Sequence, residues 1–250
     1  MTFFNPIENF WPRTLPLSDV YLVATRFDHR PISDEEFASS GVPLPPNLQF
    51  AAHKRRAEFL AGRLCAYQAL LMLNGTGYFP GTRKDRAPKW HQSCVGSITH
   101  SNTWAAALVG RQDKYLALGL DMEHCLSNCD GRKLAEGILT EAEWLRFSKA
   151  PSDHLGLIVT LAFSLKESLF KALYPLVGTL FYLEHAELVN WNIDTGIAHL
   201  RLLKNLDNDL SAGRELEAHF CQVDGHIMSL VAVQNIKPRV TSILKHFPMK

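Results

Sequence analysis

Residues 118–123 have the sequence Leu-Gly-Leu-Asp-Met-Glu and carry two carboxylates, Asp121 and Glu123, separated by one residue. Side chains on a strand point alternately to its two faces, so both acids would share one face while Leu120 and Met122 share the other. Two residues of extended chain span roughly 6.6 Å, which lets the two carboxylates converge on one hard cation. Taken alone, this pattern is more often a strand whose polar face meets solvent.

A third carboxylate, Glu167, lies in residues 163–171, a helical pattern that also holds Lys166 and Lys171. Helical spacing puts Glu167 and Lys171 on one face. From the residues alone, this pair is either a surface ion pair worth about 0.3–0.5 kcal/mol or part of a half-buried patch flanked by phenylalanines. Three acids with lysines nearby predict a magnesium site that handles phosphate.

Residues 96–101 place hydroxyl groups beside His100 at the end of an expected strand, with Thr99 next to it. Such a cluster can donate several hydrogen bonds to phosphate oxygens. A Ser–His nucleophilic pair is a competing interpretation, but no Gly-x-Ser-x-Gly elbow surrounds either serine. A purely structural histidine also stays open.

Cationic residues cluster at the start of an expected helix, over residues 53–56, and recur at Arg63 and Arg86. A basic helix start is usually a solvated face. The sequence has neither a P-loop nor a Gly-x-Gly-x-x-Gly fingerprint, which excludes the familiar glycine-rich nucleotide cradles. A phosphate ligand would therefore be held by cationic side chains and metal.

Composition sets broad limits on the fold and its partners. A chain of 250 residues can bury a sizeable core, and 46% hydrophobic with 20% charged residues is ordinary for a globular protein. The formal net charge of +1 excludes strong bulk attraction to nucleic acid. Without a secretory signal or an apolar run of membrane-spanning length, we expect a cytoplasmic protein that does not bind membranes.

The five cysteines support the same compartment, because an odd number without a signal peptide indicates reduced thiols. His124, Cys125 and Cys129 lie close together and raise the possibility of a zinc site. No second pair with matching spacing follows, so structural thiols are the favoured interpretation.

Two long helices are expected to position these motifs. Apolar residues recur at helical spacing over residues 51–73 and 155–173, and Tyr174 with Pro175 should end the second helix. A loop is expected over residues 126–131.

Short alternating runs supply the expected strands. Residues 95–99 and 105–109 precede the acidic strand, and further runs with turns at residues 194–196 and 224–225 complete an antiparallel sheet. The architecture is therefore α+β, with two halves packed together and a cleft between them.

The motifs, taken together and in this order, resemble the 4'-phosphopantetheinyl transferases, in particular the longer bacterial type similar to enterobactin synthase component D. The matching segments are residues 61–63, 87–90, 96–101, 119–123 and 163–171. The last two are specific at this separation, while the first two are weak. Members often have Ser where this chain has Thr99, which keeps the hydroxyl.

The resemblance implies a pseudo-two-fold α+β fold, each half a long helix packed on a mostly antiparallel sheet, with the active site in the cleft. An N-terminal arm over residues 1–18 would precede a first half over 19–112, which contacts coenzyme A phosphates. A second half over 113–250 would hold the metal site and dock the carrier protein. We expect a monomer.

The resemblance also implies the roles of individual residues. Asp121, Glu123 and Glu167 would hold Mg²⁺, with Mn²⁺ also possible, against the coenzyme A pyrophosphate. Glu167, and secondly Glu123, would take the proton from the attacking serine. Further contacts with the phosphate groups of coenzyme A would come from Arg56, Arg63, Arg86, Thr99, His100, Lys166 and Lys171.

The implied reaction moves phosphopantetheine from coenzyme A to a serine of an apo acyl or peptidyl carrier protein and releases 3',5'-ADP. Residues 125–145, with Arg132, Lys133, Leu134 and Ile138, would help to dock the carrier, although an ordinary packed helix pair fits them equally. The alternatives are a non-catalytic module that binds coenzyme A or a nucleotide, and a metal-dependent phosphohydrolase. Siderophore, polyketide and fatty-acid synthesis all stay open as settings.

Overall fold

A computed structural model describes residues 4–12, 14–148 and 154–235 of the chain. Its first sheet has the strand order β1-β2-β6-β5 and is antiparallel throughout. A second antiparallel sheet has the order β7-β11-β10-β9-β8. The α+β class expected from the sequence is confirmed. The strands of the two sheets are β1 (Ile7–Glu8), β2 (Val20–Arg26), β5 (Cys94–His100), β6 (Trp104–Arg111), β7 (Tyr115–His124), β8 (Ala186–Asn192), β9 (Ile197–Leu202), β10 (Glu215–Val223) and β11 (His226–Gln234).

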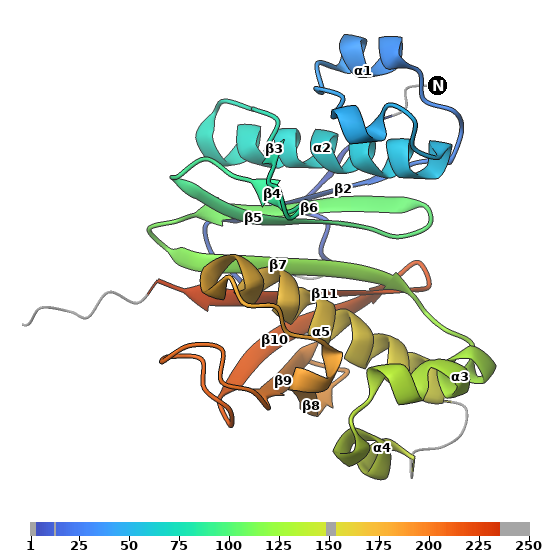
Figure 1. The fold of residues 1–250 in the computed structure, drawn as a ribbon, viewed down its shortest axis with the longest axis vertical. Coiled ribbons are helices and arrows are strands. Elements are labelled where there is room, and N and C mark those ends of the chain that lie inside the picture. The colour runs from blue at the N-terminus through green and yellow to red at the C-terminus, as the bar shows by residue number, and fades with distance from the viewer. Residues whose placement is uncertain (1–3, 13, 149–153, 236–250) are drawn as a thin grey trace, which may run out of the picture.

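Two long helices, α2 (His53–Asn74) and α5 (Leu155–Val177), cover the outer faces of the two sheets (Figure 1). One apolar cluster lies between α2 and the first sheet, and another between α5 and the second. A third cluster fills the layer between the sheets with side chains of β2, β6, β7 and β11. The layers therefore run helix, sheet, sheet, helix. The remaining elements are α1 (Asp34–Ser40), α3 (Asn128–Ile138), α4 (Glu141–Phe147), η1 (Pro46–Leu48), η2 (Leu183–His185) and the short pair β3 (Gly81–Thr82) and β4 (Pro88–Lys89).

Two boundaries differ from the sequence expectations. Helix α3 begins at Asn128, inside the expected loop, because the Ser127 hydroxyl accepts a hydrogen bond from the Asp130 N–H and caps the helix. Helix α5 continues past Pro175, which costs one internal hydrogen bond, and ends at Val177. Gly178 caps it in the left-handed conformation, and the Gly178 N–H donates to the Tyr174 carbonyl. Short helix α1 was not expected, since among its residues only Phe37 is buried.

The expected turn at residues 224–225 is confirmed. Asp224 and Gly225 join β10 to β11 and both have positive φ, 48° and 71°. This backbone matches the twist of the two strands that the turn connects.

Two glycines allow the helices to lie close to the strands that carry the polar motifs. A Cβ at Gly119 of β7 would come within 1.9 Å of the Ser168 carbonyl oxygen of α5. A Cβ at Gly62 of α2 would come within 2.8 Å of the Ile98 side chain of β5. Because the first clash is with backbone, only glycine lets α5 approach β7 this closely.

Gly119→Ala should therefore destabilise the protein, by about 3 kcal/mol, since the added methyl group overpacks a rigid contact. Gly137→Ala is the matched control, because Gly137 lies in α3 with no atom within 4 Å of an added Cβ. The control should gain about 0.5–1 kcal/mol from its better helix propensity. Urea unfolding of both variants measures the difference, and equal stabilities would contradict this account of the α5–β7 contact.

Candidate active site

The carboxylate of Asp121 is the centre of the polar residues that the sequence singles out. Its side chain is 2% exposed. Oδ1 accepts hydrogen bonds from Lys171 Nζ at 2.5 Å and from Thr99 Oγ1 at 3.2 Å. Oδ2 is buried and has no hydrogen-bond partner among the described residues. The predicted alternation of faces is confirmed, because Leu120 and Met122 lie in the apolar layer between the sheets.

This centre joins three elements from both halves of the chain. Thr99 comes from β5 of the first sheet, Asp121 from β7 of the second, and Lys171 from α5. Lys171 Nζ also donates to Thr99 Oγ1 at 3.3 Å, so the three side chains contact one another. A buried charge is costly unless it is paired, and here the ion pair of Asp121 and Lys171 supplies the partner.

The other two acids lie near this ion pair and are half-buried. Burial raises the pKa of Glu123 to about 7; the charges of Asp121 and Glu167 add to the rise and Lys171 opposes it. Burial also raises the pKa of Glu167, with Lys171 opposing and Asp121 adding to the shift. The site therefore concentrates carboxyl groups that resist ionisation together.

The carboxylates suit a hard cation in their chemistry, and the unpartnered Oδ2 of Asp121 offers a lone pair to one. Within residues 4–12, 14–148 and 154–235, however, no three His, Cys, Asp or Glu side chains are gathered closely enough to hold a metal ion. Among the same described residues, His124, Cys125 and Cys129 do not form such a group either. The metal assignment of Asp121, Glu123 and Glu167 stays a prediction.

A basic cavity of about 130 Å³ opens beside this centre, between α2, β5 and the loop before β4. His100 Nε2 lies 3.0 Å from Arg55 Nη1, and burial lowers the pKa of His100 while the Glu58 carboxylate opposes that shift. The charged or titratable side chains that line the basic cavity are Arg55, Glu58, Arg63, Arg86 and His100.

Arg63 is fixed in the wall of this cavity. Its guanidinium lies 4.5 Å from the centre of the Phe59 ring, a cation–π contact, and Nη2 donates to Thr82 Oγ1 at 3.1 Å. Two of the sequence-predicted arginines, Arg63 and Arg86, are thus brought together with His100.

Arg56 does not lie in the cavity. Its guanidinium is 6% exposed, and it donates to the carbonyls of Ile32 at 3.0 Å and Gln49 at 3.1 Å and pairs with Asp34 at 2.5 Å. These partners hold the loop before α2 and leave the group turned away from the site. The neighbouring Arg55 points into the cavity instead. The sequence pattern did not single out Arg55, although it shares a helical face with Phe59 and Gly62, which meet β5.

Lys166 also lies away from the acid centre. Nζ donates to Glu143 Oε2 at 2.7 Å and to the Ile138 carbonyl at 2.8 Å, and the side chains of Lys166 and Glu143 are 1% and 0% exposed. Burial lowers the pKa of Lys166, and the Glu143 carboxylate opposes the shift. This pair connects α5 to α4 and, through the Leu188 N–H that Glu143 accepts, to β8.

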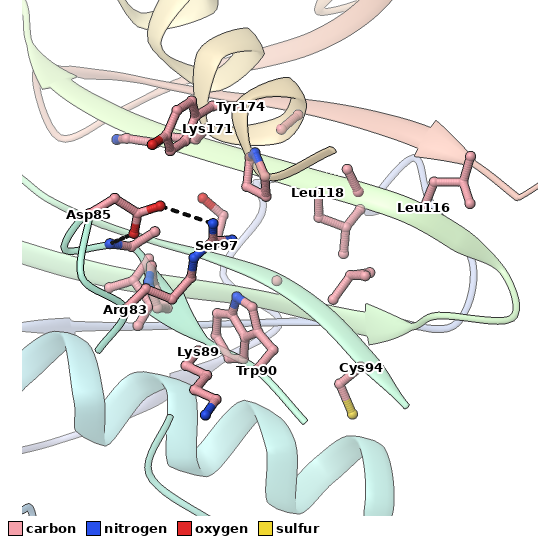
Figure 2. Close-up of a pocket in the computed structure, with 18 of the residues that line it drawn as sticks. Arg83, Asp85, Lys89, Trp90, Cys94, Ser97, Leu116, Leu118, Lys171 and Tyr174 are labelled. Carbon is pink, nitrogen blue, oxygen red and sulfur yellow. Dashed lines mark hydrogen bonds and ion pairs between the residues drawn. The ribbon is translucent and has the colours of Figure 1, made fainter. Parts of the chain in front are cut away.

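A second cavity, of about 740 Å³, begins at Lys171 and runs between the halves. Figure 2 shows Trp90 and Lys89 on one side and Leu118, Lys171 and Tyr174 on the other. Arg83 and Asp85 form an ion pair at 3.0 Å on its rim. The cavity offers apolar walls with cationic groups at one end, which fits an amphipathic ligand bearing negative charge.

Buried carboxylates and a lysine lie where the two helix-backed sheets meet, with a basic cavity beside them, and this combination has the chemistry to bind a phosphate-bearing ligand. A family model described as the 4'-phosphopantetheinyl transferase N-terminal domain matches residues 45–110. The model of the 4'-phosphopantetheinyl transferase superfamily matches residues 117–230.

Comparison with complete protein sequences points to the same family. Enterobactin synthase component D of Escherichia coli strain K12 is 34% identical over 188 residues, covering 74% of this chain and 85% of that protein. The 4'-phosphopantetheinyl transferase Svp of Streptomyces mobaraensis is 35% identical over 190 residues, covering 73% and 74%. Npt of Nocardia iowensis, also named a 4'-phosphopantetheinyl transferase, is 30% identical over 148 residues, covering 59% of this chain and 64% of its own. The chain belongs to the 4'-phosphopantetheinyl transferase superfamily, and it is an enzyme of that class.

Lys166→Met should lower the free energy of unfolding by about 3–5 kcal/mol, because it leaves Glu143 charged and unpaired in the core. Replacing both partners, with Lys166→Met and Glu143→Leu, should recover much of the loss. Lys133→Met is the control, since its pair with Asp130 is exposed and screened by solvent and should add little to stability. Chemical denaturation tests this, and an unchanged stability in the single variant would return Lys166 to the phosphate-binding candidates.

Glu123→Gln should stabilise the protein at pH 8 but not at pH 4, in buffer free of divalent metal. The folded-state pKa of about 7 lies above the ordinary glutamate value of 4.5, so raising the pH ionises the unfolded chain first and stability is lost between these values. Glutamine does not ionise, so the variant does not lose this stability as the pH rises. Glu136→Gln, at an exposed position of α3, should show no such pH-dependent gain in parallel denaturation series. A difference in free energy of unfolding between Glu123→Gln and wild type that does not grow with pH would contradict the raised pKa of Glu123.

Proposed function

We propose that this enzyme transfers the 4'-phosphopantetheine group of coenzyme A to a serine hydroxyl of an apo acyl or peptidyl carrier protein. The serine Oγ forms a bond to the β-phosphorus, the bond from that phosphorus to the bridging oxygen breaks, and 3',5'-ADP leaves. The observation that carries the proposal is the contact of Thr99, Asp121 and Lys171 beside two further half-buried acids, within a member of this superfamily.

Asp121, Glu123 and Glu167 would hold Mg²⁺, or Mn²⁺ in its place. The unpartnered Oδ2 of Asp121 and the concentration of carboxyl groups support this assignment. When bound, the ion would neutralise charge that develops on the phosphate oxygens during transfer.

Lys171 would contact the pyrophosphate, because its ammonium lies in the acid centre and also lines the large cavity. Thr99 would donate its hydroxyl to the same ligand. Glu167 is our first candidate to take the serine proton, and Glu123 the second, since a positioned carboxylate must accept it. Both acids lie near enough to Lys171 for its charge to influence them.

The remaining phosphate of coenzyme A, on the 3' position of the ribose, would enter the basic cavity. Coenzyme A has three phosphorus atoms, and two belong to the pyrophosphate that the acid centre would take. Arg63, Arg86 and His100 line the cavity and would contact the third. Arg56 and Lys166 have no part in this proposal, because both are engaged elsewhere.

Helix α3 would form part of the surface that docks the carrier protein. Arg132 and Lys133 are exposed on it, and Leu134 is 47% exposed beside them. Carrier domains of this family's partners are acidic around the modified serine, so cations around an exposed leucine complement them. Ile138 is packed against the core and is left out of the docking surface.

The organisation of the chain supports an active site that lies between two halves. We propose an arm over residues 1–18 and halves over 19–112 and 113–250, related by a pseudo-two-fold axis. In each half a long helix covers an antiparallel sheet, and the two family models meet near the proposed boundary. We place the enzyme in the cytoplasm as a monomer, in keeping with free thiols at Cys65, Cys94, Cys125 and Cys129. Every helix in the described part of the chain is too short or too polar to cross a membrane.

Asp121→Asn and Glu167→Gln should each reduce transfer at least about 100-fold, because each removes a charge from the reacting centre. The test incubates protein, coenzyme A, Mg²⁺ and an apo-carrier domain and follows the carrier by mass spectrometry. Wild type should add the mass of phosphopantetheine. Glu217→Gln, at an exposed position of β10, is the control and should keep wild-type transfer, while circular dichroism checks the fold of every variant.

Two outcomes of this assay would count against the proposal. Transfer retained by Asp121→Asn or Glu167→Gln would overturn the site assignment. Coenzyme A binding by wild type without any gain in carrier mass would favour the non-catalytic module.

A further inference from the structure

Glu58 is a buried carboxylate in a cavity whose other charged groups are cationic. Its side chain is 8% exposed, and it lines the cavity together with Arg55, Arg63, Arg86 and His100. An acid in a site for phosphate would weaken anion binding unless its charge is used for something else. Its partners show what that use is.

The carboxylate of Glu58 contacts basic side chains through both oxygens. Oε2 lies 3.4 Å from Arg55 Nη1, and Oε1 lies 3.6 Å from His100 Nδ1 and 3.9 Å from Lys54 Nζ. Arg55 Nη1 in turn lies 3.0 Å from His100 Nε2. Since arginine only donates, Nε2 accepts, which assigns the ring proton to Nδ1, on the side of Glu58.

Glu58, Arg55 and His100 thus form a closed set in which each group limits the others. Arg55 and His100 are about half as exposed as free side chains or less, at 48% and 37%, while Glu58 is almost covered. The acid therefore anchors the set from inside, and the two basic groups face the cavity.

We propose that Glu58 is a positioning residue that fixes Arg55 and His100 so that the cavity selects ligands carrying a phosphate monoester. The inference rests on the proposed function, in which the only monoester of coenzyme A is its 3'-phosphate. Glu58 does not contact the ligand. It acts by holding the Arg55 guanidinium in place, both directly and through the His100 ring, so that less of the freedom of that side chain is lost when the phosphate binds.

If Glu58 acted only through its charge, its removal would change the affinity for phosphate in the opposite direction. Its removal would then strengthen phosphate binding by relieving repulsion. The two accounts predict changes in opposite directions, which makes an isosteric substitution decisive.

The experiment compares Glu58→Gln with wild type, using coenzyme A and 3'-dephospho-coenzyme A as substrates for a carrier domain. The KM for coenzyme A should rise about tenfold, as expected for weakened hydrogen bonds to a charged group, with little change in kcat or in the KM for the dephospho substrate. Glu58→Asp keeps the charge but shortens the side chain, and it should show the same loss of preference. The control, Glu187→Gln, removes a carboxylate that is 6% exposed and paired with Arg146 and Arg201, far from the cavity, and should keep the preference.

Binding of 3',5'-ADP and of 5'-AMP, measured by calorimetry, repeats the comparison without any transfer. A preference of wild type for 3',5'-ADP that falls in Glu58→Gln supports the inference even if no carrier is modified, which would be a failure of the proposed function alone. An unchanged or increased preference in Glu58→Gln overturns the inference. So does a wild type that does not distinguish the two ligands.

Discussion

The close approach of α5 to β7 at Gly119 is the constraint on which the site depends. A Cβ there would lie 1.9 Å from the Ser168 carbonyl oxygen, so any other residue would push the helix away. Lys171 follows Ser168 on the same helix, and Asp121 follows Gly119 on the same strand. Their contact of 2.5 Å therefore exists only because the backbones are allowed to touch two residues earlier on β7 and three residues earlier on α5.

That contact also joins the two halves. The sheets are held face to face by a mostly apolar layer, which is strong but not directional. The hydrogen bonds of Thr99 to Asp121 and of Lys171 to Thr99 add a direction, because they fix how β5 of one sheet lies against β7 of the other. Stability and site geometry thus have one source, because the side chains that meet at the candidate site also fix how the two sheets pack.

Sequence patterns predicted the long helices, the α+β class and the alternation around Asp121, because these follow from local periodicity. They could not separate Lys166 from Lys171. Both flank Glu167 on one helix, yet one is buried with Glu143 and the other meets Asp121. The difference lies in what packs against each face, and Glu143 comes from a distant segment. Arg55 and Arg56 differ for the same reason, since the partners of Arg56 are carbonyls of a preceding loop.

In each half of the chain a buried acid holds basic side chains that face a cavity. Asp121 holds Lys171 in the second half, and Glu58 holds Arg55 and His100 in the first. A flexible cation alone would lose side-chain entropy on meeting phosphate, whereas one already held by a carboxylate has lost it on folding. The acids weaken the positive potential of the cavities, but they hold the hydrogen-bond donors that line them in fixed positions. For a ligand with phosphates at two separate places, fixed donors in both halves make the spacing between those phosphates a criterion of recognition.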